Sequence, residues 1–256
     1  MRQRKNKFAN FLILIAGIAF LIGLWEVMIV LLQIPNYILP APQAVLSTLA
    51  SDRLILWEHF KSTFFQWSVG LSISIAAALF LSWLAFESRH FDNLLSRSLV
   101  VSQSVPYLTI APLLLLWLGL GAAPKIVLIL LTCTFPITQL TTTGLRNAQK
   151  EFSTLAVILR LKRRSALKHI YAPAALPDFF EGVKISVIYA FVSAVLAELI
   201  GSESGLGVYL SRAQSAYRTD RVLAVVVVIV SFSLMCSWMT RRVAQKILFW
   251  RVEGNA

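Results

Sequence analysis

Three long stretches without charge constrain this chain more than any other feature of its sequence. Val222–Thr240 and Ile126–Leu145 contain no charged residue, and Phe8–Leu32 is interrupted only by Glu26. A helix that crosses the hydrocarbon core of a bilayer needs about 20 predominantly apolar residues, and these stretches have that length. Backbone groups inside lipid must form hydrogen bonds within their own segment, which favours helices. The sequence therefore predicts an all-α integral membrane protein.

The overall charge supports a membrane protein and gives no reason to expect a nucleic-acid partner. Only 14% of the residues are charged, whereas soluble domains have about a quarter. The formal net charge of +12 comes from 24 Lys and Arg residues against 12 Asp and Glu. Lys and Arg gather on the cytoplasmic side of membrane proteins, so this excess is interpreted as a signal for orientation in the lipid bilayer.

Six transmembrane helices are predicted in a single membrane domain covering residues 1–256. They lie roughly at residues 8–32, 62–86, 94–118, 125–145, 178–200 and 222–248. Ala44–Lys61 is expected to form a surface helix after a proline-rich turn, and Ser202–Arg221 a polar loop containing Gly205 and Gly207.

The distribution of basic residues predicts that both termini are cytoplasmic. With the amino terminus inside, 18 of the 24 Lys and Arg residues lie on the inner side of the six helices. The six on the outer side are Arg53, Lys61, Lys125, Arg212, Arg218 and Arg221. The segment between the fourth and fifth helices, residues 146–177, is then cytoplasmic.

This cytoplasmic segment has more structure than an orienting signal requires. Apolar residues recur in it at helical spacing, which predicts two short amphipathic helices with a basic elbow at Lys162–Arg164. Pro173 and Pro177 are expected to keep the second helix from running smoothly into the next membrane segment. An apolar stripe outside the membrane needs a surface to cover it, and lipid headgroups or a second protein would serve.

The same segment resembles the cytoplasmic loop of the permease subunits of ABC importers. The loop motif of that family reads EAA, three residues, Gly, nine residues, Ile-x-Leu-Pro. With its proline placed on Pro173, Ile170 matches the isoleucine and Ala156 the second alanine. The chain departs from the motif at four positions, which are Thr154 for the glutamate, Leu155 for the first alanine, Arg160 for the glycine and Ala172 for the leucine.

Four further stretches carry the resemblance across most of the chain. Each is similar, in the same order, to permeases of the nitrate, sulfonate, taurine and thiamine-precursor group. They are LPAPQAVLSTL (Leu39–Leu49), VPYLTIAPLLLLWLGLG (Val105–Gly121), APAALP (Ala172–Pro177) and AELIGSESGLGVYL (Ala197–Leu210).

The resemblance implies a function and a set of partners. The chain would be an importer permease in the cytoplasmic (inner) membrane, working as a homodimer with two ATPase subunits and an external substrate-binding protein. It would hold no cofactor, since ATP would be bound by the partner, and the sequence has no phosphate-binding G-x-x-x-x-G-K-[ST] stretch and is not expected to be an enzyme. The ATPase-coupling residues would be Leu155, Ala156, Leu159, Arg160, Leu167, Ile170 and Pro173.

Other residues leave a functional and a structural interpretation open. Pro106 and Pro112 interrupt the third predicted helix, where they could line the pathway or kink the helix, or serve packing alone. Glu26 and Glu198 are carboxylates in or near membrane segments, for which a structural role is favoured.

Two other classes of protein remain as alternatives. A secondary transporter driven by an ion gradient would be expected to show repeated halves and a charge at mid-membrane, and neither is evident. A membrane anchor or receptor could use the basic segment to bind anionic lipid. The absence of a basic cluster at mid-depth slightly favours a neutral heterocycle, such as the thiamine pyrimidine precursor, over an anionic solute such as a sulfonate, nitrate or taurine.

Overall fold

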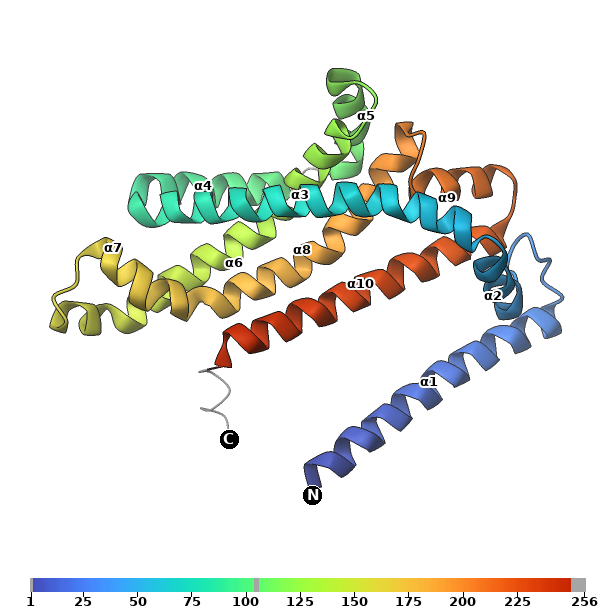
Figure 1. The fold of residues 1–256 in the computed structure, drawn as a ribbon, viewed down its shortest axis with the longest axis horizontal. Helices are drawn as coiled ribbons and strands as arrows, with labels where there is room; N and C mark the ends of the chain where they lie inside the picture. Colours follow the sequence, from blue (N-terminus) through green and yellow to red (C-terminus); the bar gives the residue numbers. More distant parts are fainter. Residues whose placement is uncertain (1, 104–105, 250–256) are drawn as a thin grey trace. The chain divides into compact units, whose positions relative to one another are not determined.

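A computed structural model describes the backbone of residues 2–103 and 106–249. It describes their side chains from residue 16 onward, apart from residues 18, 99–100, 102–103 and 108. Every regular element in these ranges is helical, which confirms the all-α prediction (Figure 1). Four helical stretches in the described residues are long and apolar enough to cross a membrane, and two shorter apolar helices, Ala19–Leu32 and Thr109–Leu118, accompany them. The count of six spans stays a prediction.

The chain divides into two compact units. The first comprises the residues up to Glu58 together with Tyr209–Val228. It contains α1 (Arg2–Leu32) and α2 (Pro42–Ser51), and the boundary between the units falls within three helices, α3 (Arg53–Glu87), α9 (Leu206–Ser215) and α10 (Thr219–Ile247).

Asp52 organises the polar interior of the first unit. It separates α2 from α3, and its carboxylate accepts a hydrogen bond from the Tyr209 hydroxyl at 2.6 Å and pairs with Arg221 at 3.0 Å. Burial and the neighbouring Asp52 both raise the pKa of the Tyr209 hydroxyl. A second carboxylate, Asp220, accepts from Thr48 at 2.8 Å and pairs with Arg218 at 2.8 Å. The first unit is therefore held together by charge-assisted hydrogen bonds as well as apolar contacts.

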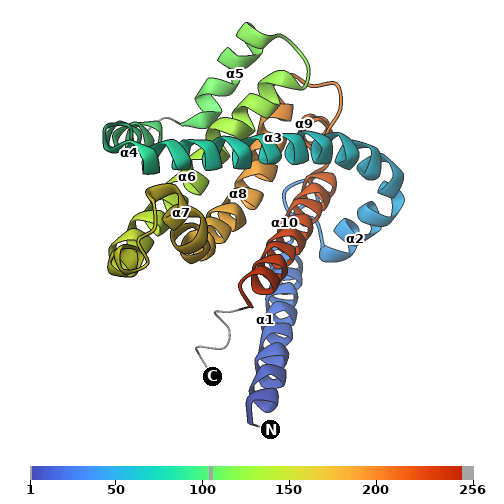
Figure 2. The same cartoon turned by 60° about the vertical axis from the view of Figure 1, so that its left-hand side comes forward.

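The second unit contains the rest of the described helices. They are α4 (Arg89–Gln103), α5 (Tyr107–Leu118), α6 (Ala123–Ile158), α7 (Arg163–Ala166), a π-helical turn η1 (Leu167–Tyr171) and α8 (Ala172–Gly201). Helices α6 and α8 run antiparallel and side by side, as both views show (Figures 1 and 2). A Cβ atom on Gly182 would lie 2.9 Å from the Cα of Ile137, so glycine is required at this close approach of the two backbones.

Three predicted boundaries differ from the structure. The expected surface helix 44–61 is split, because α2 ends at Ser51 and Lys61 already belongs to the long α3. The expected span 94–118 is also divided, since Pro106 forms the amino-terminal cap of α5 and the preceding α4 is amphipathic. The expected polar loop 202–221 contains α9, which starts at Leu206. The long apolar run hid the break at Pro106 and the amphipathic character of α4, the turn at Asp52 carries no strong helix-breaking signal, and the glycines in 202–221 indicated a loop where the short α9 forms.

The bend of the predicted cytoplasmic segment lies at Arg160, two residues before the expected elbow. Helix α6 continues to Ile158 and ends in a Schellman motif, in which the Leu161 amide donates to the Ala156 carbonyl and the Arg160 amide to the Val157 carbonyl. Arg160 has a φ of +50°, a conformation that favours glycine. The position where the resembled motif has glycine is thus the position where the backbone turns.

Pro173 and Pro177 do not stop the helix, contrary to expectation. Helix α8 begins at Ala172 and continues through both prolines to Gly201. Directly before them the chain forms the π-helical turn, in which the Ala172 amide donates to the Leu167 carbonyl. This turn is wider than an α-helical one, and Pro173 lies in the first turn of α8, where a missing amide costs little. The second short helix therefore merges with the fifth predicted span.

We expect Arg160→Gly to stabilise the protein, because glycine adopts this left-handed conformation without the steric penalty of a side chain. The left-handed conformation costs a side-chain-bearing residue about 1–2 kcal/mol, and the extra chain entropy of glycine offsets roughly 0.5–1 kcal/mol of this. The net gain should therefore be about 0.5–1 kcal/mol, measured as a rise in the thermal unfolding midpoint of the purified permease. Lys162→Gly is the matched control, since it removes the same charge at a φ of −66°. An Arg160→Gly variant no more stable than Lys162→Gly would contradict the left-handed conformation of the backbone at residue 160.

Candidate functional site

One face of the segment 146–177 is buried against the rest of the chain. Ala156, Ala166 and Tyr171 are buried in a cluster with Phe86, at the end of α3. Leu167 and Ile170 are half-buried against the same cluster. These residues were expected on an exposed apolar stripe, but they help to hold the segment in place. Their part in coupling stays a prediction.

The opposite face of the segment exposes a different group of apolar residues. Leu155, Val157, Ile158 and Leu159 are 43%, 75%, 71% and 55% exposed, and we call them the exposed apolar end of α6. The uncharged part of α6, residues 126–145, spans about 30 Å at 1.5 Å per residue, which already matches the hydrocarbon core. Residues 146–158 therefore extend beyond it. Of the predicted coupling residues, Leu155, Leu159 and Arg160 are exposed and thus available to a partner.

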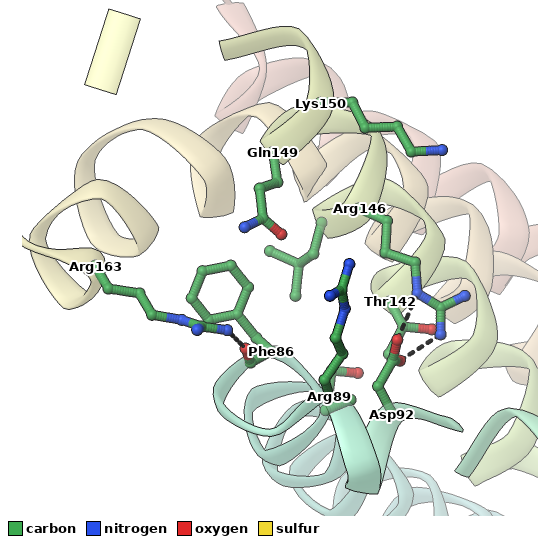
Figure 3. Close-up of a pocket in the computed structure, with 11 residues that line it drawn as sticks. Phe86, Arg89, Asp92, Thr142, Arg146, Gln149, Lys150 and Arg163 are labelled. Atoms are coloured by element: carbon green, nitrogen blue, oxygen red, sulfur yellow. Dashed lines mark hydrogen bonds and ion pairs between the residues drawn. The ribbon is translucent and has the colours of Figure 1, made fainter. Parts of the chain in front are cut away.

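Two arginines fasten the start of α7 to the end of α3. The Arg163 guanidinium donates to the backbone carbonyl of Phe86 and lies 4.9 Å from the centre of its ring (Figure 3). Arg164 forms a 3.5 Å ion pair with Glu87. A cation over an aromatic face adds about 0.5–1 kcal/mol at an exposed site. The basic elbow therefore makes structural contacts with the end of α3.

A cavity of about 710 Å³ lies along α6 and α8 within the apolar spans. The residues around it carry no charge, although several are polar or aromatic: Tyr107, Thr132, Phe135, Gln139, Tyr189 and Ser193 are among them. Ser193 donates a hydrogen bond to the Thr132 hydroxyl at 3.0 Å across the two helices. Pro136, inside α6, also lines the cavity, whereas the predicted pathway residues Pro106 and Pro112 do not.

Glu198 is a buried structural carboxylate that joins α3, α8 and the start of α9. It is 1% exposed, and it accepts hydrogen bonds from the Thr63 hydroxyl and from the Gly207 amide, both at 2.9 Å. Thr63 in turn accepts from the Leu206 amide. Two amino-terminal amides of α9 are therefore satisfied by side chains of other helices. Buried Lys125 interacts electrostatically with Glu198, and Glu26 is half-buried on α1.

The helical spans, the uncharged cavity and the segment that extends beyond the membrane together define a polytopic membrane transport subunit. The chain belongs to the family of binding-protein-dependent transport system inner membrane components, whose model matches residues 70–249. It is thus the permease subunit of an ABC importer, in the inner membrane, and this family works with an ATPase and a substrate-binding protein. Family membership decides against a secondary transporter and against a simple anchor.

Relatives that are named as transport permeases match nearly the whole chain. The chain is 36% identical to a probable ABC transporter permease protein of Haemophilus influenzae, over 87% of this chain and 90% of that protein. It is 27% identical to the formylaminopyrimidine transport permease protein ThiX of Halalkalibacterium halodurans, over 90% and 92%. Among solved structures, an amino acid ABC transporter with histidines matches with a TM-score of 0.61 at 15% identity, over 80% of this chain and 97% of that one.

We expect Gly205→Ala to destabilise the protein more than a glycine replacement in open space. Gly205 has a φ of +122°, and a Cβ atom there would lie 2.1 Å from the Glu198 carboxyl group. Gly121→Ala is the matched control, because Gly121 has a φ of +140° with no atom within 4 Å of the added carbon. Both variants carry backbone strain, and overpacking should cost Gly205→Ala about 1–3 kcal/mol more. Thermal unfolding of the two proteins measures the difference, and equal midpoints would contradict the role of Glu198.

Proposed function

We propose that this permease imports a small, uncharged, ring-containing solute, and that it does so as a homodimer with two ATPase subunits and an external binding protein. Both termini are proposed to lie in the cytoplasm, because 18 of the 24 Lys and Arg residues then lie on the inner side. The exposed apolar end of α6 is proposed as the contact with the ATPase. That exposed group, just beyond the membrane, is the single observation that carries the proposed coupling to the ATPase.

The solute class follows from the cavity along α6 and α8. No Lys, Arg, Asp or Glu is among its lining residues, so an anion such as a sulfonate would have no charged partner there. Tyr107, Tyr189 and Phe135 offer ring faces, while Thr132, Ser193 and Gln139 offer hydroxyl and amide groups. An apolar cavity with a few polar groups suits a neutral heterocycle. The relative named for formylaminopyrimidine transport supports this choice, whereas others are named for aliphatic sulfonates and taurine.

The coupling proposal depends on how the segment 146–177 is held. Its buried face contacts α3 through the cluster around Phe86 and through Arg163. A force applied to the exposed apolar end of α6 would therefore act on α3 and α8 as well as on α6. Movement of an attached ATPase would in this way displace α6 and α8, the helices that line the cavity.

We expect Ile158→Asp to give a folded permease that binds its ATPase poorly and no longer transports. Losing the burial of one large aliphatic side chain costs about 1.5–3 kcal/mol, which weakens association roughly tenfold or more. Copurification with the ATPase and ATP-dependent uptake in proteoliposomes measure the two effects. Tyr217→Asp is the control, since Tyr217 is 76% exposed in the turn after α9 and is proposed to lie outside. Normal copurification of Ile158→Asp with the ATPase would contradict the proposed contact.

We expect Tyr189→Ala to weaken transport without affecting ATPase association. Loss of one aromatic contact with the solute should raise the KM for uptake roughly two- to tenfold. The solute is the ligand that the cognate external binding protein selects in a screen of neutral heterocycles and sulfonates. Phe80→Ala is the control, because Phe80 is a 56% exposed aromatic on α3 that does not line the cavity. Selection of a sulfonate, or an unchanged KM for Tyr189→Ala, would contradict the proposed solute class.

A further inference from the structure

A second cavity, of about 540 Å³, lies where the end of α3 and the start of α4 meet α6 and α7 (Figure 3). Its lining includes four basic side chains, Arg89, Arg146, Lys150 and Arg163, and a single carboxylate, Asp92. Asp92 is already paired with Arg146, and Arg163 with the Phe86 carbonyl. The cavity therefore has a clear excess of positive charge that its own residues do not neutralise.

Two of the four cations are available to a ligand. In the described part of the chain, the side chains of Arg89 and Lys150 form no hydrogen bond or ion pair. Figure 3 shows Arg89 and Gln149 pointing toward one another across the hollow, while the Lys150 side chain lies at its edge and extends outward. A guanidinium and an amide thus face the same space, with an ammonium at its rim. All three donate hydrogen bonds, and the two cations favour an anionic acceptor.

A deeper residue of the wall also lacks a partner. Ser82 lines the cavity and is 1% exposed, yet its hydroxyl forms no hydrogen bond with any described residue. A buried polar group without a partner costs about 1–3 kcal/mol. An orphaned donor in the wall of a positively charged hollow is explained if an anion with several acceptor oxygens occupies it. A signal for orientation in the membrane would require neither a cavity nor a buried hydroxyl in its wall.

We propose that this cavity binds a phosphate-bearing anion. A phosphate group offers enough oxygens for Arg89, Lys150 and Ser82 together, and a guanidinium can bind it through two parallel hydrogen bonds. The cavity is far larger than one side-chain carboxylate, so an acidic residue of the ATPase would leave most of it empty. Ser82 lies four residues before the end of the predicted span 62–86, so the hollow reaches the level of the lipid headgroups. Basic pockets between membrane helices bind such headgroups.

The same chemistry could be supplied by an anionic phospholipid or by a soluble phosphate ester. The assembled transporter, permease with its ATPase, is purified in detergent and examined by native mass spectrometry with phosphatidylglycerol and with phosphatidylcholine. A parallel titration uses glycerol 3-phosphate as the soluble probe. Because binding in detergent does not depend on orientation or on the transported solute, this experiment can fail independently of the proposed function.

We expect the transporter to bind one of the two anionic probes in preference to phosphatidylcholine. Loss of one charge-assisted contact in Arg89→Gln or Lys150→Gln should weaken that binding about tenfold or more. Arg97→Gln is the matched control, since Arg97 is an exposed cation of the same α4 that does not line the cavity. Preference for phosphatidylglycerol would identify a lipid site, and saturable binding of glycerol 3-phosphate a soluble ligand.

Two results would overturn the proposal. One is that the wild type, Arg89→Gln and Arg97→Gln all bind each anionic probe with the same affinity. The other is a loss of ATPase copurification in Arg89→Gln without any change in the binding of either anionic probe, which would assign the cavity to the subunit contact.

Discussion

The close contact between α6 and α8 is the interaction on which the second unit depends. In a bilayer, lipid is as apolar as leucine, so two helices associate through close packing and hydrogen bonds between them. Gly182 allows the backbones to approach, and the Ser186 hydroxyl donates to the Cys133 carbonyl at 3.1 Å across the interface. A larger residue at 182 would separate the helices and disturb the cavity that they line.

The same helix pair also connects the membrane to the segment beyond it. Helix α6 extends past its uncharged part, turns at Arg160 and returns through α7 and the π-helical turn directly into α8. The returning chain is packed on Phe86 of α3. Because the segment is continuous with two spans and anchored to a third, it behaves as an extension of the membrane helices. That arrangement suits a subunit whose family is driven by a separate ATPase.

Polar groups in this permease are used mainly for structure. Glu198 satisfies an amide at the start of α9, and Thr63 satisfies another. In the first unit, Asp52 and Asp220 have the corresponding role for Tyr209 and Arg218. The cavity around Arg89, Lys150 and Ser82 differs in combining two unpaired cations with a buried hydroxyl that has no partner among the described residues.

The sequence by itself determined that this chain is helical, lies in a membrane and belongs among importer permeases. These conclusions rest on long apolar runs and on local motifs, which are properties of neighbouring residues. Only the tertiary structure decided that Leu167 and Ile170 face the chain's own core, while Val157 and Ile158 are exposed. It also decided that the helix continues through Pro173 and Pro177. Helical periodicity shows that an apolar face exists, but the partner of that face is a residue such as Phe86, far away in the sequence. Arg160 likewise has a positive φ, which its side chain disfavours, in a helix cap whose next residue, Leu161, packs against the cluster around Phe86.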